Sequence, residues 1–395
     1  MTRIALYSHD ALGLGHVRRS LALAQAFSGL RPRPDLLVLS SVPEAALLPR
    51  PRGCDVLTLP GLLRRGQERY AARDLLGVPP PEVRLLRSVA LRAALTAFAP
   101  DLFVVDRHPR GAHAELETAL AALPSTTRVV LGLRDVLDEP VAAAGEWTAH
   151  RCTEALDAWY DAVWVYGDRG LHDPTEHIRI PHRLRDDVVF TGYLAPARRR
   201  PSPPADQEGT PGPVLGLVGG GADGAATAHA FVAAACLHGR PAVLVLGPQM
   251  PGEERVALRS AALGVPTLLV HDFVRGTAPL LDRSSAVVAM GGYGTTCEVL
   301  ASGLPALVVP RTRPRREQLL RASMLARRRL VDLLHPDDLG PEAVASWVNE
   351  VSDVSEVSEG RRRAGSYGVD LDGLARVRDL AVAVLERRRP VHVAV

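Results

Sequence analysis

Residues 286–310, AVVAMGGYGTTCEVLASGLPALVVP, are the stretch that decides the fold. An apolar run ends at Met290, the pair Gly291 and Gly292 follows, and a second apolar run begins after Gly303. The segment between these glycines has the length of a short helix. Two apolar runs joined by such a helix predict a βαβ unit with parallel strands. We therefore expect an α/β domain here.

The turn in this unit has the features of a phosphate site. Glycines allow a ligand to approach the backbone closely, and the free amides of a helix start favour an anion. Gly292, Gly294, Thr295 and Thr296 are the candidate contacts. Glu298, one turn into the helix, could accept hydrogen bonds from the hydroxyls of a ribose. A tight crossover with a capped helix explains the same residues without a ligand.

A second glycine turn follows an apolar strand earlier in this half. Gly219, Gly221 and Gly224 fit the GxGxxG pattern, which also requires an acidic residue about 20 positions later for dinucleotide binding. The next strand, residues 242–246, is followed by Gly-Pro-Gln instead. We therefore predict that Gly219, Gly220 and Gly221 contact phosphate, and a nicotinamide dinucleotide is disfavoured.

Two more segments of this half carry candidate ligand contacts. The strand at 267–273 ends at Phe273 and Val274, which could lie beside a nucleotide base. Glu317 and Gln318 begin a later helix and could hydrogen-bond sugar hydroxyls. An acidic residue that interacts with the helix dipole explains Glu317 equally well.

The first half begins with a strand at residues 4–8 and the loop HDALGLGH, which contains Asp10 and ends in Gly15 and His16. A helix follows from residue 17. A strand, a glycine loop and a helix in this order are the anion-binding arrangement of α/β proteins. Arg18 in the first helical turn opposes the helix dipole, a cost that a bound anion would offset. A solvated arginine pair explains Arg18 and its neighbour equally well.

Further apolar strands alternate with helical stretches, which indicates a parallel sheet covered on both faces. These strands are predicted at 36–39, 56–59, 102–105, 129–133 and 162–166. Ligands of such sheets bind beyond the carboxyl ends of the strands. Three ends carry ionisable residues, namely Asp10, Asp106 with His108, and Arg134. We expect a catalytic rim there.

Composition shifts predict the domain boundaries. Residues 196–213 contain six prolines and no apolar period, as in a linker. We expect a first domain at 1–195, a second domain at 214–373, and a C-terminal helix and tail at 374–395 that could pack back on the first domain.

Two other segments have no assigned ligand contacts. Residues 61–81 are rich in Arg, Gly and Pro and are expected to form a long loop, which could cover an acceptor or simply be mobile. Asp370 and Asp372, the one DxD pattern, are expected to cap the last helix rather than to bind a metal.

Composition excludes several classes of protein. The 395 residues are 47% apolar and 23% charged, and all 47 basic residues are arginine, with a net charge of +3. A nucleic-acid partner is disfavoured because the basic clusters have no interleaved aromatic residues. Four scattered cysteines suggest reduced thiols in the cytoplasm and no zinc site. The start of the chain lacks a signal-peptide layout, and no apolar run reaches membrane-spanning length, so only peripheral membrane contact stays open.

Two α/β halves and a nucleotide-like site in the second half resemble the GT-B fold of sugar-nucleotide glycosyltransferases, in which two Rossmann-like domains face a cleft. The details are similar to the MurG-type family, glycosyltransferase family 28. The segments HDALGLGHVRRS, VVDRHPRGAHAEL and LGLRDVLDEP resemble a branch of predicted bacterial glycosyltransferases. The matching residues are Gly15, His16, Gly219, Gly220, Gly221, Phe273, Val274, Gly292, Thr295, Glu298, the sequence Gly303-Leu304-Pro305, Glu317 and Gln318. Arg321 and Ala322 stand where the family has an asparagine.

The resemblance implies an inverting glycosyltransferase that needs no metal or other cofactor. Its donor would be a UDP-sugar such as UDP-N-acetylglucosamine or UDP-glucose, and its acceptor a small or lipid-linked molecule with a nucleophilic hydroxyl. His16 is the first candidate for the general base. Asp10, Asp106 and His108 are the alternatives, and Arg18 and Arg134 are candidates to hold phosphate or an anionic acceptor.

Three other functions fit less well. A sugar-nucleotide 2-epimerase shares this fold and donor but needs no acceptor. A non-catalytic nucleotide-sugar-binding protein would bind UDP without releasing it from a donor. An oxidoreductase would need the acidic residue that the second glycine turn lacks. The sequence does not indicate an oligomeric state.

Overall fold

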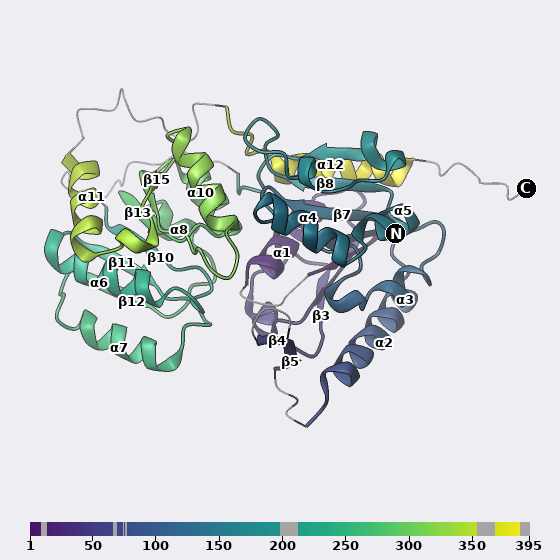
Figure 1. Ribbon diagram of the computed structural model, residues 1–395, viewed down its shortest axis with the longest axis horizontal. Coiled ribbons are helices and arrows are strands. Elements are labelled where there is room, and N and C mark those ends of the chain that lie inside the picture. Colours follow the sequence, from purple (N-terminus) through teal and green to yellow (C-terminus); the bar gives the residue numbers. More distant parts are fainter. Residues whose placement is uncertain are drawn as a thin grey trace, which may run out of the picture. The chain divides into compact units, whose positions relative to one another are not determined.

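The computed structural model describes residues 1–8, 14–65, 69–73, 75, 77–197, 212–353 and 368–387 (Figure 1). The chain divides into two compact units. Unit 1 comprises Met1–Leu12, His16–Leu194 and Asp372–Val395, and unit 2 comprises Gly13–Gly15 and Ala195–Leu371. The linker expected at 196–213 lies mostly outside the described residues, as does Asp10.

Unit 1 is built on a seven-stranded, wholly parallel sheet with the strand order β3-β2-β1-β6-β7-β8-β9. Its strands are β1 (Arg3–Tyr7), β2 (Asp35–Ser40), β3 (Cys54–Thr58), β6 (Leu102–Asp106), β7 (Arg128–Arg134), β8 (Ala162–Tyr166) and β9 (Val188–Phe190). The order reverses between β1 and β6, the place where open α/β sheets bind ligands. The predicted α/β fold class is confirmed.

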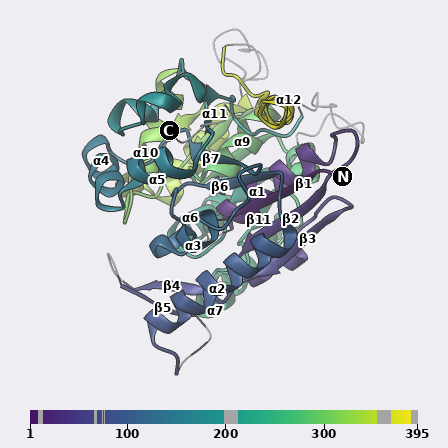
Figure 2. The ribbon, with the colours of Figure 1, turned by 90° about the vertical axis from the view of Figure 1, so that its right-hand side faces the viewer.

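Helices cover both faces of this sheet because alternate strand residues point to opposite sides and both sets are apolar. The helices of unit 1 are α1 (Gly15–Phe27), α2 (Pro80–Phe98), α3 (Glu117–Leu120), α4 (Pro140–Ala149), α5 (Cys152–Trp159) and α12 (Gly373–Glu386). Helices α2 and α12 lie on opposite sides of the strands (Figure 2). Phe27 of α1 contacts Trp164 of β8 with ring centroids 6.4 Å apart, which fixes α1 on its face.

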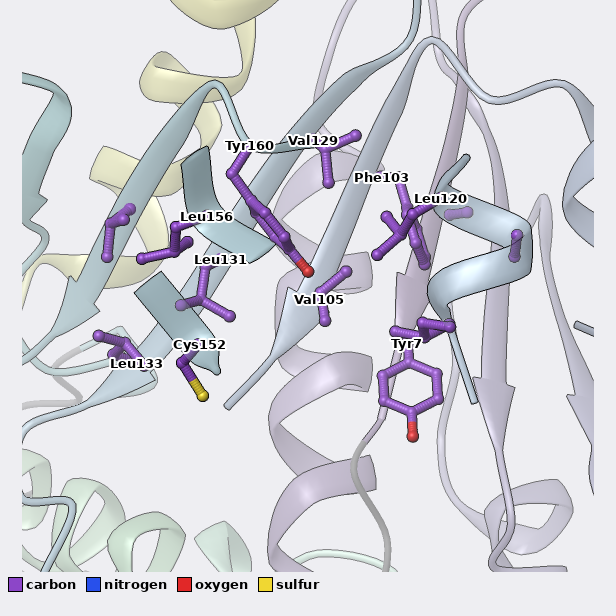
Figure 3. Close-up of a cluster of buried hydrophobic side chains, with 14 of the residues drawn as sticks. Tyr7, Phe103, Val105, Leu120, Val129, Leu131, Leu133, Cys152, Leu156 and Tyr160 are labelled. Carbon is purple, nitrogen blue, oxygen red and sulfur yellow. The ribbon is translucent and has the colours of Figure 1, made fainter. Parts of the chain in front are cut away.

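One face carries a buried hydrophobic cluster, part of which is shown in Figure 3. Leu131 and Leu133 of β7 pack there with Leu156 of α5, and all three side chains are fully buried. Burying each such leucine contributes about 1.5–3 kcal/mol relative to exposure. Tyr160 stays in this apolar cluster because its hydroxyl donates to the carbonyl of Pro109 at 2.5 Å.

Unit 2 repeats the design with a six-stranded parallel sheet in the order β12-β11-β10-β13-β14-β15. Its strands are β10 (Val214–Leu217), β11 (Ala242–Val245), β12 (Leu268–His271), β13 (Ala286–Ala289), β14 (Ala306–Val308) and β15 (Asp332–Leu333). Its helices are α6 (Ala225–His238), α7 (Gly252–Ala262), α8 (Ala278–Leu281), α9 (Tyr293–Ser302), α10 (Glu317–Arg327) and α11 (Pro341–Asp353). The order reverses between β10 and β13. The βαβ unit predicted at 286–310 is confirmed as β13, α9 and β14.

The long loop expected at 61–81 is wrong in part. Two short strands, β4 (Leu62–Arg65) and β5 (Arg69–Ala72), pair there as an antiparallel hairpin, and α2 already begins at Pro80. Four-residue strands that contain arginines have no apolar alternation, so the sequence carried no strand signal. Cross-strand backbone hydrogen bonds form the hairpin regardless of that pattern.

The expected cap of the last helix is right in position and wrong in mechanism. Asp372 occupies the N-cap position of α12, but its side chain makes no capping hydrogen bond. Its backbone instead forms a β-bridge to Leu194. The next residue, Gly373, packs so closely that a Cβ there would lie 2.5 Å from the carbonyl oxygen of Tyr193. No helix in the described residues is long and apolar enough to cross a membrane.

Candidate functional site

The carboxyl ends of β1 and β6 in unit 1 bring together side chains that lie far apart in the sequence. His16 is the second residue of α1, which follows β1, and Asp106 is the last residue of β6. Because β1 and β6 are adjacent and parallel, their ends meet at the point where the strand order reverses. Nδ1 of His16 contacts Oδ2 of Asp106 there.

Arg19 completes this cluster. Its Nε and Nη2 donate to Oδ1 of Asp106 at 3.0 and 2.6 Å, and Nη2 lies 2.9 Å from Nδ1 of His16. A spacing of three residues places His16 and Arg19 on the same face of α1. The side chains of Arg19, Asp106 and His16 are 3%, 7% and 12% exposed, so this is a nearly buried charge cluster.

The hydrogen bonds assign the tautomer of His16. Nδ1 faces the carboxylate of Asp106, which accepts but cannot donate, so we assign the proton to Nδ1. The Nη2 group of Arg19 is already engaged with Asp106 and does not need Nδ1 as its acceptor. This tautomer leaves Nε2 of His16 as the nitrogen that can accept a proton.

Electrostatics keep the imidazole neutral and the carboxylate charged. Burial lowers the pKa of His16 to about 4, and this outweighs the opposite influence of Asp106. Burial alone would raise the pKa of Asp106, but Arg19 and His16 hold it well below its usual range. A neutral imidazole oriented by a carboxylate is chemically suited to act as a general base.

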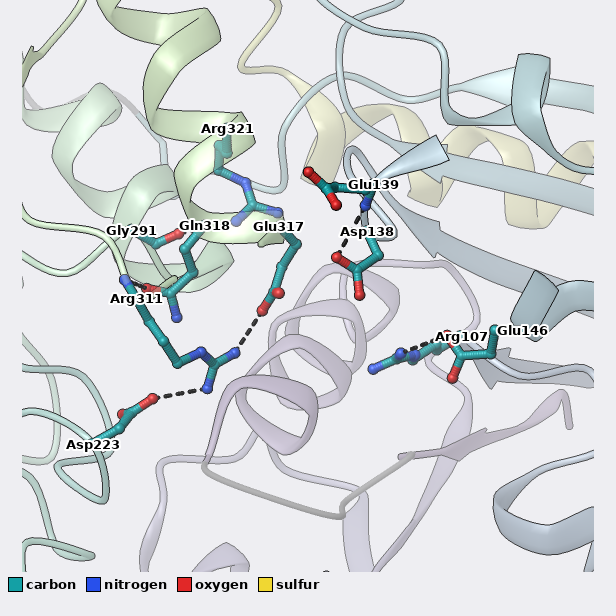
Figure 4. Close-up of polar contacts among 10 residues, drawn as sticks. All are labelled: Arg107, Asp138, Glu139, Glu146, Asp223, Gly291, Arg311, Glu317, Gln318 and Arg321. Carbon is teal, nitrogen blue, oxygen red and sulfur yellow. Dashed lines mark hydrogen bonds and ion pairs between the residues drawn. The ribbon is translucent and has the colours of Figure 1, made fainter. Parts of the chain in front are cut away.

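The structure separates residues that the sequence treated as alternatives. Asp106 is the partner of His16, whereas Nε2 of His108 lies 3.5 Å from Oε1 of Glu146, and its ring lies 5.5 Å from that of His150. Arg107, between Asp106 and His108, has a φ of +70° and places Nη2 3.4 Å from Oε2 of Glu146 (Figure 4). A left-handed arginine next to the cluster is backbone strain of the kind that gathers at functional sites.

Two arginines were predicted to hold phosphate or an anionic acceptor. Arg134 ends β7 and its residue is 9% exposed, and Arg18 is half-buried in the first turns of α1. Arg19 was missing from the predicted site residues. Its spacing from His16 was the available signal, but its partner Asp106 is 87 positions away.

In unit 2, the carboxyl ends of β10 and β13 place the two predicted glycine turns side by side. Leu217 pairs with Ala289 at the last position of the ladder, and the amide of Met290 donates to the carbonyl of Leu217 at 3.1 Å. The first turn needs its glycine at position 221, where φ is +93° and a Cβ would lie 2.4 Å from the carbonyl oxygen of Leu246. Gly219, with a φ of +65°, also has a left-handed backbone.

The glycines at the start of α9 have a different basis. Gly292 is its N-cap with an ordinary φ of −63°, and a Cβ at Gly292 or Gly294 would meet no atom within 4 Å. Neither steric crowding nor backbone conformation within the described protein requires glycine at these two positions. Space beside exposed amides at a helix N-terminus is what an approaching anion needs.

The other predicted contacts of unit 2 fall on the same edge of the sheet. Thr296 is buried at 6% exposure, while Thr295 and Glu298 lie half-buried in the first turns of α9. Phe273 and Val274 follow β12 and are also half-buried.

A guanidinium that the sequence prediction missed links these segments. Arg311 donates from Nη1 to Asp223 at 2.8 Å and from Nη2 to Glu317 at 2.6 Å (Figure 4). Its backbone amide donates to Oε1 of Gln318 at 3.1 Å. Burial alone would lower the pKa of Arg311, but the two carboxylates raise it above its usual value. Arg311 therefore connects the first glycine turn to the start of α10.

Glu317 and Gln318 have partners within the protein. Both residues are buried, at 2% and 8% exposure, and both already hydrogen-bond Arg311. Their predicted contact with sugar hydroxyls stays a prediction.

Arg321 of α10 is fully buried beneath the second glycine turn. Its Nη1 donates to the carbonyl of Gly291 at 2.9 Å, and its guanidinium lies 5.6 Å from the centre of the Tyr293 ring. Arg321 thus fixes the peptide that precedes the N-terminus of α9.

Known proteins resemble the chain in sequence and in structure. No family model matches it. It is 28% identical over 239 residues to UDP-N-acetylglucosamine--N-acetylmuramyl-(pentapeptide) pyrophosphoryl-undecaprenol N-acetylglucosamine transferase of Klebsiella pneumoniae subsp. pneumoniae. The matched residues are 58% of this chain and 62% of that protein. The protein of the same name from Salmonella typhi is 26% identical over 337 residues, 84% of each chain.

Solved structures settle the fold. The calicheamicin glycosyltransferase CalG4 superposes with a TM-score of 0.61 at 20% identity, over 98% of this chain and 100% of its own. The chain has the GT-B fold. MurG of Acinetobacter baumannii gives a TM-score of 0.58 at 15% identity, over 97% and 100% of the two chains. UDP-GlcNAc 2-epimerase of Neisseria meningitidis, bound to UDP-GlcNAc, gives 0.60 at 12% identity, over 98% and 99%.

The predicted resemblance to MurG-like GT-B glycosyltransferases is thereby confirmed. The chain spans about three fifths of the length of the Klebsiella relative.

Proposed function

We propose that the chain is a glycosyltransferase that moves a sugar from a nucleotide-sugar to a hydroxyl of an acceptor, with inversion at the anomeric carbon. The observation that carries this proposal is the neutral, nearly buried His16 held by Asp106 at the switch point of unit 1. The names of the relatives, N-acetylglucosamine transferases, support the same reaction class.

The proposed reaction moves one proton and one glycosyl group. The acceptor oxygen attacks the anomeric carbon while its proton passes to Nε2 of His16, and the bond from that carbon to the diphosphate breaks. Asp106 stabilises the imidazolium that forms and keeps Nδ1 protonated. A positioned base of this kind contributes about 10²–10⁴-fold to the rate. Direct attack by the acceptor inverts the anomeric centre.

The nucleoside diphosphate leaves with increased negative charge, which unit 2 is proposed to stabilise. The amides of the two glycine turns and the N-terminus of α9 are fixed dipoles that need no reorganisation during the reaction. Gly219, Gly220, Gly292, Gly294 and Thr295 are the proposed contacts to the diphosphate. We propose that no metal ion is required, and unchanged turnover in excess EDTA is the expected result.

The remaining donor contacts follow from position along the sheet edge. We propose that Glu298 accepts hydrogen bonds from the ribose hydroxyls and that Phe273 and Val274 lie beside the base. A UDP-sugar such as UDP-N-acetylglucosamine is the proposed donor, since the relatives named above use UDP-N-acetylglucosamine. The acceptor is proposed to be a small or lipid-linked molecule with a free hydroxyl.

Epimerisation is the second candidate, because an epimerase has the same fold at a similar TM-score. The two functions differ in their need for an acceptor. Incubation with UDP-N-acetylglucosamine alone, followed by chromatography of the sugars, would yield the 2-epimer in the one case and only slow hydrolysis in the other.

The proposal is tested with a panel of nucleotides and a His16→Ala variant. Thermal stabilisation by one nucleoside diphosphate identifies the donor class, and nucleotide release is then measured with an acceptor screen. His16→Ala should lose at least about 10²-fold in turnover, whereas the exposed control His182→Ala should retain it. Unchanged turnover in folded His16→Ala removes His16 from the mechanism, and failure of every nucleotide to bind refutes the transferase proposal.

A further inference from the structure

The side chain of Arg311 lies where the strand order of unit 2 reverses, between β10 and β13. Arg311 follows β14, which pairs with β13, and β13 in turn pairs with β10. Asp223, which binds Nη1 of Arg311, lies in the glycine turn that follows β10. To reach from the end of β14 to the turn after β10, the side chain must pass over the carboxyl end of β13. That end is where the second glycine turn begins and where a diphosphate is proposed to bind.

The two ends of this ion-pair network differ in how firmly they are held. Glu317 has 3% of its side chain exposed and lies 2.6 Å from Nη2 of Arg311. Asp223 has 41% of its side chain exposed and lies 2.8 Å from Nη1. An exposed ion pair contributes little to stability, whereas breaking a buried pair is strongly destabilising. Glu317 therefore anchors the guanidinium, and Asp223 is the partner that can be exchanged.

The guanidinium of Arg311 also has one N–H group whose hydrogen-bonding capacity is unused within the described residues. The Nε–H of Arg311 is buried and has no hydrogen-bond acceptor within the part of the chain that the structure describes. A buried donor without an acceptor is unfavourable, so binding of a ligand that offers an acceptor at this position would be favoured. A planar guanidinium with free donors matches the oxygens of a phosphate group.

We propose that Arg311 binds the diphosphate of the nucleotide donor and exchanges Asp223 for it on binding. The proposal rests on the proposed function, since it assumes a nucleotide ligand in unit 2. Glu317 and Gln318 then act as positioning residues, which hold the side chain and backbone of Arg311. Asp223 keeps the guanidinium over the empty site and competes with the ligand, because its carboxylate repels a diphosphate that approaches the glycine turn.

The experiment compares a nucleoside diphosphate with its nucleoside. The diphosphate that most stabilises the wild-type protein is selected from UDP, dTDP, GDP and ADP, and calorimetry then gives its dissociation constant and that of the matching nucleoside. Arg311→Gln should weaken diphosphate binding by about 10- to 100-fold, the range for loss of a charge-assisted hydrogen bond. Nucleoside binding should change less than about 2-fold, which also shows that the variant is folded.

Two more variants sharpen the test. Asp223→Asn should tighten diphosphate binding severalfold and leave nucleoside binding unchanged, because it removes only the competing charge. Arg283→Gln is the matched control, since Arg283 is an exposed arginine of the same unit that precedes β13 and so lies at the opposite end of that strand. It should leave both dissociation constants unchanged and so exclude a general effect of net charge.

The outcomes separate this inference from the proposed function. If the wild-type protein binds a diphosphate and Arg311→Gln binds it equally well, the salt bridge is only structural and the inference is overturned. Weaker diphosphate binding in Asp223→Asn would also overturn the exchange, since it would make Asp223 a contributor to binding. If no nucleotide binds the wild-type protein, the proposed function fails first, and the inference fails with it.

Discussion

Replacing Arg19 by methionine should shift the acidic limb of the pH–rate profile to higher pH. In the folded protein Arg19 binds Oδ1 of Asp106 at 3.0 and 2.6 Å while His16 contacts the other oxygen. Methionine retains an apolar stem of similar length and removes the cation. The carboxylate then acts on His16 without Arg19 to oppose it, so protonation of the imidazole becomes easier.

The size of the shift follows from the charges around the imidazole. Burial and the nearby Arg19 both lower the pKa of His16, which lies at about 4. A charge within a few Å changes a pKa by roughly 1–3 units, so removing Arg19 should bring the limb to about pH 5–7. Loss of one member of the buried pair should also destabilise the fold, by about 3 kcal/mol because His16 still donates to Asp106.

The assay is kcat/KM for nucleotide release between pH 4 and 9 at constant ionic strength, with circular dichroism at each pH to restrict the data to folded protein. Arg92→Met is the control, since Arg92 is exposed on α2. Because only neutral His16 can accept a proton, activity is lost below its pKa, and a higher pKa moves this loss to higher pH. A folded Arg19→Met protein whose limb coincides with that of the wild type would refute the reasoning.

Three other predictions test the same structure. Acidification from pH 6.5 to 4 should destabilise the protein by about 3 kcal/mol, since the pKa of His16 falls from 6.5 to about 4 on folding and the unfolded state binds the extra proton. Urea unfolding at the two pH values should show a smaller loss of unfolding free energy in His16→Asn than in the wild type. An equal loss would exclude His16 as the cause. Gly221→Ala should lower the free energy of unfolding by at least about 1–3 kcal/mol because of its left-handed φ of +93°. The control Gly252→Ala, at the uncrowded start of α7, should change this free energy by less than about 1 kcal/mol. Equal urea midpoints for the two variants would contradict the prediction. Iodoacetamide at pH 8 should label the exposed Cys236 well before Cys152, because burial raises the pKa of the Cys152 thiol to about 12; peptide mass spectrometry measures the order, and equal rates would contradict it.

The sequence predicted the elements whose signal is local. The apolar runs on either side of α9 identified β13 and β14, because a strand buried on both faces must be apolar at nearly every position. The hairpin β4–β5 was missed because backbone pairing, rather than an apolar pattern, holds its short arginine-containing strands. Asp372 was placed correctly at the start of α12, but the backbone bridge that it forms has no signature in its side chain.

The sequence predicted many residues of the site but not which of them contact each other. His16 was expected at the turn from the glycine loop into the first helix and Asp106 at a strand end. The two were treated as rivals for one role, because nothing local shows that β1 and β6 are neighbours. Arg19 and Arg311 were missed for a related reason. In a chain with 47 arginines, an individual arginine carries little information. Their partners Asp106 and Asp223 lie 87 and 88 positions away.

The return of the last helix to unit 1 has a consequence for synthesis on the ribosome. Val377, Ala381 and Val384 of α12 are buried, yet they belong to a unit whose other strands and helices end by Leu194. The whole of Ala195–Leu371 is translated before α12 appears. At about 5–20 residues per second this takes roughly 10–35 s. During that interval nascent unit 1 exposes the apolar surface that α12 later covers, so unit 1 is completed only after Ala195–Leu371 has been translated.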